Sequence, residues 1–416
     1  MLALNRVLVR ALGFGHEHEH EREHGGWVMT RWWMLLALGG CDDRAPHHEV
    51  EVDAAVDATP ITLPCSGQVF PRSSGHRGQL VWDGQSFILG YNNYGEGTGL
   101  EAWSPDGVMR WHHPLPNGPV TLWRENGQIR ALHRDEDATT FALTVSPEGE
   151  VAPLAWPPLA GYYVPEVLPA SDGALWLVEA RRVWRLVGQA VVFEEASNRD
   201  AEATDYNGPA AVGPDGRLTV LIRRYREDVE HAESLLVTYE TDGARQDTAF
   251  EPDFLPGGLA YDAEGRLLVV GSRTGATMEV GFSSYIQGFG GRLQGLGLEP
   301  LDYDHPFACP SDLENNRYFD GLTAMPGGDW LVHGTLCSDG FSWTLWLLRL
   351  APDGAVRWQA RLGPMNENGL RGVAVADDGT IALSGWSVEC CPDTFGNDVP
   401  WLMFVDPEGR CLDAVR

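Results

Sequence analysis

The sequence predicts an all-β fold: a single β-propeller, most simply built from seven four-stranded blades. Three observations support this prediction. A turn-and-strand unit recurs seven times, and its marker glycines are 43, 46, 43, 49, 63 and 51 residues apart. That period matches a blade of four short strands. Helical periodicity is nearly absent, and the 49 glycines and 27 prolines separate short apolar runs throughout.

The repeated unit begins with a tight turn and continues into a short apolar strand. An acidic residue and a glycine, or two glycines, precede the apolar run, and a second glycine follows six residues after the first. The clearest copies span 83–90, 264–271, 327–334 and 378–385, and weaker ones begin at 126–127, 172–173 and 215–216. Glycine supplies the positive φ of such turns. The second glycine lets the chain either leave the strand or approach a neighbour closely.

A second turn marker follows within most units, where the third strand should turn into the fourth. It lies at 104–107, 146–149, 241–243, 351–354 and 406–409, and it usually combines proline, an acidic residue and glycine. The third and fifth units lack a clear copy. Because these two units diverge, six or eight blades remain alternatives to seven.

The repeats resemble two bacterial propeller families. The glycine-flanked strand followed by an Asp-Gly marker resembles repeats of the delta-60 type. Trp111 and Trp358 each lie four residues after the marker glycines Gly107 and Gly354, a spacing similar to that of pyrroloquinoline-quinone-like repeats. The resemblance covers nearly all of the chain after residue 75. It implies the scaffold and leaves the ligand open.

The charge balance narrows the classes of partner. The chain has 30 basic and 59 acidic side chains, with a net charge of −29. This balance disfavours nucleic acid, whose phosphates require basic patches, and docking to anionic lipid. Solubility is the simpler interpretation of the charge, and attraction of cations or a basic partner is the alternative.

The N-terminal region predicts an exported lipoprotein. Residues 29–40 combine a basic start with a short apolar run, and Leu38-Gly39-Gly40-Cys41 resembles a lipobox. Cys41 would then carry the lipid, and the acidic residues 41–60 would form a disordered tether to the propeller at 61–416. We expect a periplasmic, outer-membrane or cell-surface location, with the lipid as the only membrane contact. The His- and Glu-rich residues 1–28 indicate that translation starts near Met29, or else a metal-binding tract suited to zinc or nickel.

Six cysteines remain if Cys41 is lipidated, an even number that an exported protein would pair. The predicted pairs are Cys65–Cys411, Cys309–Cys337 and the adjacent Cys390–Cys391. Buried free thiols are the alternative. The first pair would join the two ends of the ring, and closing so long a loop contributes roughly 4–5 kcal/mol in the chain-entropy model.

Candidate ligand-binding residues concentrate in the fifth unit, whose step of 63 residues is the longest. Functional variation in repeat folds gathers in insertions on one face, and exposed aromatic side chains there could anchor a partner. The candidates are Tyr285, Phe289, Tyr303 and His305, with Trp386 in the last unit. The alternative is a loop that has no binding function and is held in place by a disulfide.

Other polar groups are weaker candidates. His112, His113 and His333 are interpreted as loop or core histidines. Calcium could bind acidic clusters, which lie at 135–137, 200–205 and 312–320. The cluster that ends at Asp205 has Ala203 where a calcium loop requires its first ligand. We therefore predict no cofactor, with calcium as the alternative.

The predicted function is a non-catalytic binding or scaffold module, which recognises an envelope protein or a glycan through loops on one face and acts as a monomer. No nucleophile elbow or phosphate-binding glycine loop occurs in the sequence. The alternative is a propeller enzyme, either a quinoprotein-like oxidoreductase or a hydrolase, with its site in the central channel. Such a site would need polar residues that converge from several blades.

Overall fold

The structure is a computed structural model, and it describes most of the chain after residue 75. All described residues belong to one compact unit, Glu51–Arg416. They are 61–62, 68–69, 76–93, 97–116, 118, 120–134, 140–157, 159, 164–196, 203–226, 233–250, 254–262, 264–274, 286–294, 297–300, 317–336, 342–366, 368–388 and 398–412.

Within these residues the strands form seven sheets, which we number I to VII along the chain. Sheets I to III contain β3 (His76–Trp82), β4 (Phe87–Asn93), β5 (Gly97–Trp103), β6 (Met109–Leu115); β7 (Val120–Glu125), β8 (Gln128–Arg134), β9 (Thr140–Val145), β10 (Val151–Leu154); and β11 (Glu166–Pro169), β12 (Ala174–Glu179), β13 (Arg182–Val187), β14 (Ala190–Ala196). Sheets IV and V contain β15 (Ala203–Val212), β16 (Leu218–Arg226), β17 (Glu233–Tyr239), β18 (Arg245–Ala249); and β19 (Phe254–Tyr261), β20 (Leu267–Thr274), β21 (Ile286–Gln294), β22 (Gly297–Pro300). Sheets VI and VII contain β23 (Arg317–Ala324), β24 (Trp330–Leu336), β25 (Ser342–Leu350), β26 (Val356–Asn366), β1 (Ile61–Thr62); and β27 (Asn368–Val375), β28 (Ile381–Val388), β29 (Asp398–Val405), β2 (Gln68–Val69).

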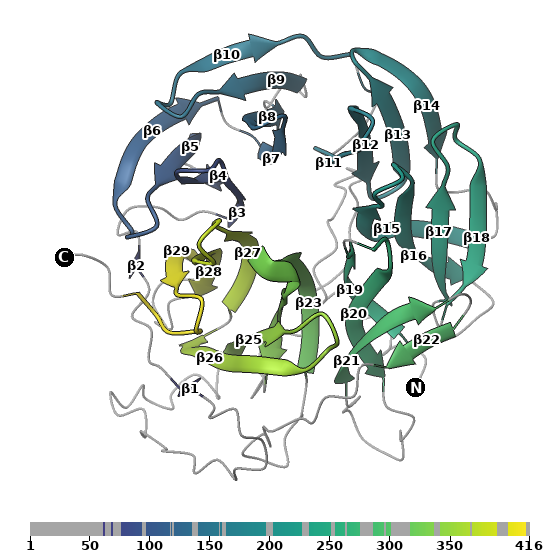
Figure 1. The fold of residues 1–416 in the computed structure, drawn as a ribbon. Helices are drawn as coiled ribbons and strands as arrows, with labels where there is room; N and C mark the ends of the chain where they lie inside the picture. Colours follow the sequence, from purple (N-terminus) through teal and green to yellow (C-terminus); the bar gives the residue numbers. More distant parts are fainter. Residues whose placement is uncertain are drawn as a thin grey trace, which may run out of the picture. The chain divides into compact units, whose positions relative to one another are not determined.

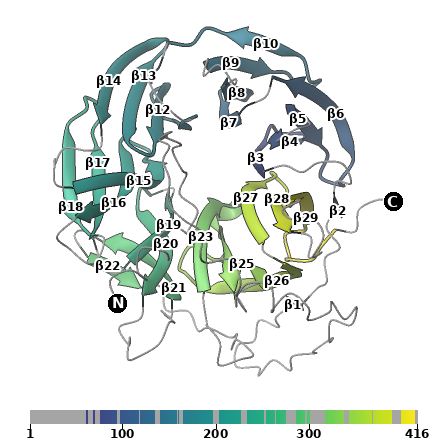
Figure 2. The same cartoon turned by 180° about the vertical axis from the view of Figure 1, so that it is seen from behind.

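The sheets pack face to face in a ring. Seven clusters of buried side chains each join two consecutive sheets, and one of them joins sheet VII to sheet I through Phe404 and Phe87, whose ring centroids are 5.7 Å apart. The first strands of neighbouring sheets contact one another, so β3, β7, β11, β15, β19, β23 and β27 lie on the inside (Figures 1 and 2). The predicted all-β, single-propeller fold is therefore confirmed.

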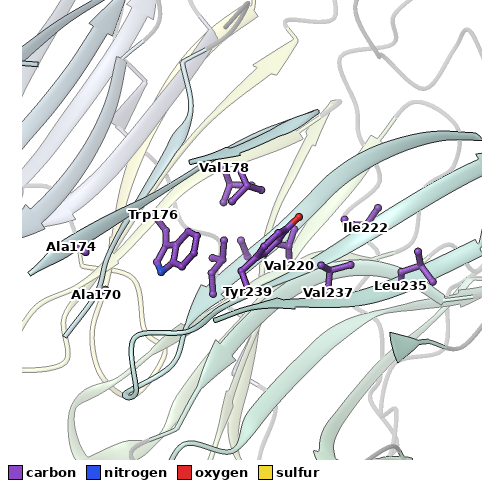
Figure 3. Close-up of a cluster of buried hydrophobic side chains, with 12 residues drawn as sticks. Ala170, Ala174, Trp176, Val178, Val220, Ile222, Leu235, Val237 and Tyr239 are labelled. Atoms are coloured by element: carbon purple, nitrogen blue, oxygen red, sulfur yellow. The ribbon is translucent and has the colours of Figure 1, made fainter. Parts of the chain in front are cut away.

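The core between two sheets is made by alternate residues of each strand. Between sheets III and IV, Trp176 and Tyr239 are fully buried and their ring centroids are 6.2 Å apart (Figure 3). The indole N–H of Trp176 donates to the carbonyl of Gly216, in the first turn of sheet IV, at 2.9 Å. The tryptophan thus satisfies its polar atom while it packs the core.

One kind of turn recurs around the ring. At Ala170, the N–H of Gly173 donates to the Ala170 carbonyl at 3.0 Å, and Gly173 has φ of 81°. The Asp172 carboxylate accepts the N–H of Ala174 at 3.1 Å. Aspartate therefore holds the turn while glycine adopts the left-handed conformation. The same carboxylate-to-backbone bond occurs at Asp215, Asp242, Asp353 and Asp378.

These turns all lie at one end of the sheets, which we call the turn end. Strands one and two, and strands three and four, are joined there. Neighbouring sheets contact each other at this end through hydrogen bonds. The Ser171 hydroxyl donates to the carbonyl of Pro214. The indole N–H of Trp111 donates to the carbonyl of Pro147 at 2.9 Å, and that of Trp358 to the carbonyl of Pro407 at 2.7 Å. The spacing of four residues between glycine and tryptophan places the indole against the next sheet's turn.

The N-terminal strands β1 and β2 each add a strand to one of the last two sheets, VI and VII. Gln68 pairs with Leu402 and Val69 with Trp401, so β2 is the fourth, antiparallel strand of sheet VII. Ile61 pairs with Ala360, which adds β1 in parallel to sheet VI. Neither pairing was predicted from the sequence.

Two details differ from the sequence interpretation. The third unit does have a second turn, between β13 and β14, where Gly188 has φ of 60°. Part of the expected insertion is a strand, because β21 begins at Ile286. Of the two roles expected for the second glycine of the repeat, Gly90 has the close approach: it lies within β4, and a Cβ there would lie 3.2 Å from Val120 of the next sheet. No helix in the described ranges is long and apolar enough to cross a membrane.

Candidate functional site

The end opposite the turns, which we call the connection end, is where the chain varies. Strand two is joined to strand three there, and each sheet is joined to the next. The longest connection by sequence is 301–316, and the connections 155–165 and 275–285 follow with equal lengths. The connections 275–285 and 301–316, which flank β21 and β22 of sheet V, lie outside the described residues. One short connection, Ala180–Arg181 between β12 and β13, is described completely.

Sheets III and IV meet at this short connection. Asn207 of β15 donates its backbone N–H to the Ala180 carbonyl at 2.7 Å and its side-chain amide to the Glu179 carbonyl at 2.7 Å. The Arg181 guanidinium lies over the Tyr206 ring, 4.8 Å from its centroid, and donates to the Tyr206 hydroxyl at 2.7 Å. Backbone and side-chain contacts therefore hold Tyr206 in place.

Glu166 lies at the same boundary. It is the first residue of the inner strand β11 and pairs with Val178 of β12, two residues before Ala180. Leu168 and Val178 contact the III–IV core, whereas Val167 contacts the II–III core. Because strand residues alternate, Glu166 is on the face directed at sheet IV.

The Glu166 carboxyl has an unusual environment. Its side chain is exposed to solvent, yet the surrounding protein desolvates the carboxyl and raises its pKa to about 7. Among the described contacts, Glu166 makes no hydrogen bond or ion pair. It is available to a ligand in either protonation state.

A second polar cluster spans sheet I. The Tyr91 hydroxyl lies 2.5 Å from His112 Nε2, and their rings stack with centroids 5.9 Å apart. Glu101, opposite His112, accepts the Trp103 indole N–H at 3.0 Å. Burial, and then the nearby Glu101 charge, raise the pKa of Tyr91 to about 12. Burial likewise raises the pKa of Glu101. The phenol stays protonated at neutral pH, so this cluster is suited to hydrogen bonding rather than to nucleophilic attack.

His333 is a third polar group, in β24 of sheet VI. Its Nδ1 is buried and has no hydrogen-bond partner, and burial lowers its pKa to about 4. Part of the ring remains accessible. The sequence interpretation of a core histidine agrees with this placement, and Nδ1 has no partner among the described residues. A neutral imidazole without a partner does not by itself form a site.

The predicted binding residues are mostly outside the described residues. Tyr285, Tyr303 and His305 lie there. Phe289 belongs to β21, where it pairs with Gly271, and Trp386 belongs to β28. Their backbones are therefore in strands rather than loops, and the structure describes neither side chain.

The predicted lipid attachment and disulfides are also mostly outside the described residues. Cys41, Cys65, Cys309, Cys337, Cys390 and Cys391 lie there. Cys411 is described. Its backbone forms an isolated antiparallel β-bridge with Val405, and its side chain packs against the core between sheets VI and VII. Its sulfur is not a free thiol. Its pairing with Cys65 stays a prediction.

Metal ligands do not gather in the described part of the chain: no group of three or more His, Cys, Asp or Glu side chains is placed to hold an ion. The acidic clusters at 135–137 and 312–316 lie outside the described residues, as does most of the cluster at 200–205. The calcium alternative therefore stays a prediction. Sequence reasoning also missed Glu166, whose environment depends on the packing of sheets III and IV, and Tyr206, which is bonded to Arg181 of the preceding sheet.

Comparisons with known proteins add the fold and little else. No protein-family model matches the chain, and no curated protein matches it. Among solved structures, the β-propeller domain of the Trilobed protease from Pyrococcus furiosus is 14% identical over 82% of this chain and 99% of that one, with a TM-score of 0.48. A gluconolactonase from Xanthomonas campestris is 15% identical over 68% of this chain and 84% of its own, with a TM-score of 0.38. A polysaccharide lyase is 9% identical over 85% and 94%, with a TM-score of 0.48. These low identities transfer no activity.

Proposed function

We propose that this protein is a lipid-anchored β-propeller of the cell envelope that binds a partner, an envelope protein or a glycan, through its connection end. The observation that carries the proposal is the difference between the two ends of the sheets. At the turn end, short turns of one design are fastened to one another by hydrogen bonds. At the connection end, the chain carries its longest connections, among them 275–285 and 301–316 of sheet V.

The chemistry of the described residues is compatible with binding. Tyr206 contacts the Arg181 guanidinium, and Glu166 makes no hydrogen bond or ion pair among the described residues. Rigid aromatic groups and unsatisfied polar groups contribute affinity without a large ordering cost. The anchor rests on the lipobox at 38–41, and the tether at 41–60 would let the ring reach partners away from the membrane.

We also infer seven blades, one for each sheet, since seven buried clusters join the sheets in a closed cycle. In the same ring we propose the Cys65–Cys411 disulfide. Cys411 follows the last strand, β29. Cys65 lies in sequence between β1, which pairs with β26, and β2, which pairs with β29. The crosslink would fasten these short N-terminal strands.

A second candidate function is an enzyme whose site lies on the inside of the ring. Glu166 favours it, because a carboxyl with a pKa of about 7 can donate and accept a proton at neutral pH. A catalytic site would need further polar groups beside it. Arg181 is nearby, but it is already bonded to Tyr206.

The test uses the full-length protein in its native host. Intact cells that express it with a C-terminal tag are cross-linked, the protein is captured, and co-purifying proteins are quantified by mass spectrometry. A matched variant replaces 275–285 by a Gly-Ser segment of equal length, and a control variant carries Glu148→Ala at the turn end. Binding through the connection end predicts that the first variant loses the partner and the control keeps it.

The same sample reports on the anchor. A lipidated Cys41 at the mature N-terminus, together with a near-stoichiometric envelope partner, would establish the proposal. Purified protein that carries neither a captured protein nor a bound glycan would refute it, and substrate screening of Glu166→Gln beside the natural protein would then test the enzyme. An unmodified Cys41 would refute the anchor alone.

A further inference from the structure

The first turn of sheet II presents an asparagine followed by a glycine to solvent. Asn126 and Gly127 are the two residues of the hairpin between β7 and β8, in which Glu125 pairs with Gln128. Both are exposed, and both have a positive φ, of 50° for Asn126 and 77° for Gly127. Among the described residues, Asn126 is the only one other than glycine with a positive φ. A hairpin turn of two such residues favours this dipeptide.

Neither reactive group of the pair is restrained within the described part of the chain. The side-chain amide of Asn126 and the backbone N–H of Gly127 take part in no hydrogen bond there. A Cβ built on Gly127 would meet no heavy atom within 4 Å. The bond between the two residues is therefore open to solvent and free of neighbouring side chains on that side.

The chain has three other Asn-Gly pairs, and the fold treats each of them differently. They lie at 117–118, 207–208 and 368–369. In the first, the N–H of Gly118 donates to Thr98 Oγ1 at 2.9 Å. In the second, the side-chain amide of Asn207 donates to two backbone carbonyls of sheet III at 2.7 and 3.3 Å. In the third, both residues belong to the ladder between β27 and β28. Each of these pairs is thus held by the fold, and 126–127 is not.

The chemistry open to such a pair is deamidation through a cyclic imide. Glycine obstructs the attack least, because it has no Cβ and its backbone rotates freely. The backbone nitrogen of Gly127 bonds to Cγ of Asn126, and the side-chain nitrogen leaves with the backbone proton as ammonia. Water then opens the five-membered succinimide. Opening at Cγ gives aspartate, and opening at the main-chain carbonyl gives isoaspartate, through which the main chain runs by way of the side chain. Water is the only co-reactant.

We propose that Asn126 is a site of spontaneous deamidation in the folded protein, so that aspartate and isoaspartate accumulate there as the protein ages. The proposal does not depend on the proposed function. Each conversion adds a negative charge beside Glu125, which is paired with Arg130 at 2.8 Å. Aspartate tolerates the left-handed conformation of this position. Isoaspartate adds an atom to the main chain of a two-residue turn, so it disturbs the pairing of Glu125 with Gln128.

The experiment follows all four Asn-Gly pairs in the full-length protein. The protein is incubated at pH 8.5 and 37 °C for several weeks, folded or unfolded in guanidinium chloride, and is then digested at acidic pH and mapped by mass spectrometry. The converted peptide gains about 1 Da in ordinary water and about 3 Da in water enriched in oxygen-18. In the folded protein, conversion at 126–127 should be at least about tenfold faster than at 207–208. In guanidinium chloride the four pairs should react at similar rates.

Two variants act as controls, and circular dichroism checks the fold of each. Asn126→Asp should show no gain in mass. Gly127→Ala places a methyl group where the structure has space but beside the attacking nitrogen, so it should slow the conversion at least about tenfold. Labelled conversion that is confined to 126–127 in the folded protein and slowed by Gly127→Ala supports the proposal. An unchanged Asn126 in the folded protein overturns it, and so does conversion at 207–208 that is as fast as at 126–127.

Discussion

The acid stability of this propeller should depend on His333. The ring lies against the inner strand β23, where Gly321 pairs with His333; a Cβ on Gly321 would lie 2.6 Å from both Cε1 and Nε2. The imidazole therefore fills the space that a side chain at 321 would take. Its Nδ1 is buried and has no hydrogen-bond partner within the described part of the chain. Protonation would place a charge there without compensation.

The sign and size of the effect follow from the pKa. Burial lowers the pKa of His333 from its ordinary 6.5 to about 4, so the unfolded chain takes up the proton first as the pH falls. The stability contributed by the neutral ring is complete above pH 6.5 and is lost as the pH falls towards 4. Between pH 7.5 and 4.5 the loss is at most about 2.5 kcal/mol, and solvent access to part of the ring reduces it towards about 2 kcal/mol.

The measurement compares the natural protein with His333→Leu. Leucine is a suitable replacement because Leu89 packs on Gly78 in sheet I as His333 packs on Gly321. Urea unfolding followed by tryptophan fluorescence at pH 7.5, 6.5, 5.5 and 4.5 gives the free energy of unfolding of both proteins. Other groups titrate in both, so they cancel in the difference. The natural protein should lose about 2 kcal/mol more than the variant. Equal losses would refute the reasoning.

Further predictions concern the contacts between sheets and the closure of the ring. Trp176→Phe should cost about 2–3 kcal/mol in urea unfolding, because it removes a buried ring and a buried hydrogen bond. Trp111→Phe, at a half-buried position, should cost less than about 1.5 kcal/mol; the opposite order would contradict the packing argument. Removal of residues 1–75 should cost about 2–4 kcal/mol more than removal of 1–60, because only the longer deletion removes β1 and β2. Cys411→Ser should lower stability by about 4–5 kcal/mol if the long loop is closed, and non-reducing peptide mapping that finds no Cys65–Cys411 peptide would rule out that pairing.

The repeat could be predicted because its signals are local. Asp172 and Gly173 form their turn with atoms no more than two or three residues away. Each copy of the turn is therefore determined by neighbouring residues in the sequence. The turn at Gly188 was missed because it lacks the proline and the acidic residue of the other copies. The pairing of β2 was missed for a different reason: a strand of two residues has no pattern, and Gln68 meets Leu402 only when the ring is complete.

The candidate site was harder to predict than the fold. Glu166 lies in a four-residue strand, Glu-Val-Leu-Pro, that resembles many exposed acidic positions in this chain. Its distinguishing property is the raised pKa of its carboxyl, which comes from the protein around it. Tyr206 becomes notable only through Arg181 of the preceding sheet. Contacts between sheets depend on packing across long sequence separations, and a single sequence does not contain that information.

Because β2 pairs with β29, the last sheet can form completely only when nearly the whole chain is present. Gln68 and Val69 are among the first folded residues to be synthesised, and Trp401 and Leu402 are among the last. The early strand has no partner in sheet VII until almost the whole chain has been synthesised. A chain cut short anywhere before residue 398 offers it no partner in sheet VII. Such a chain would present an open sheet edge to proteases, so degradation would remove incomplete molecules.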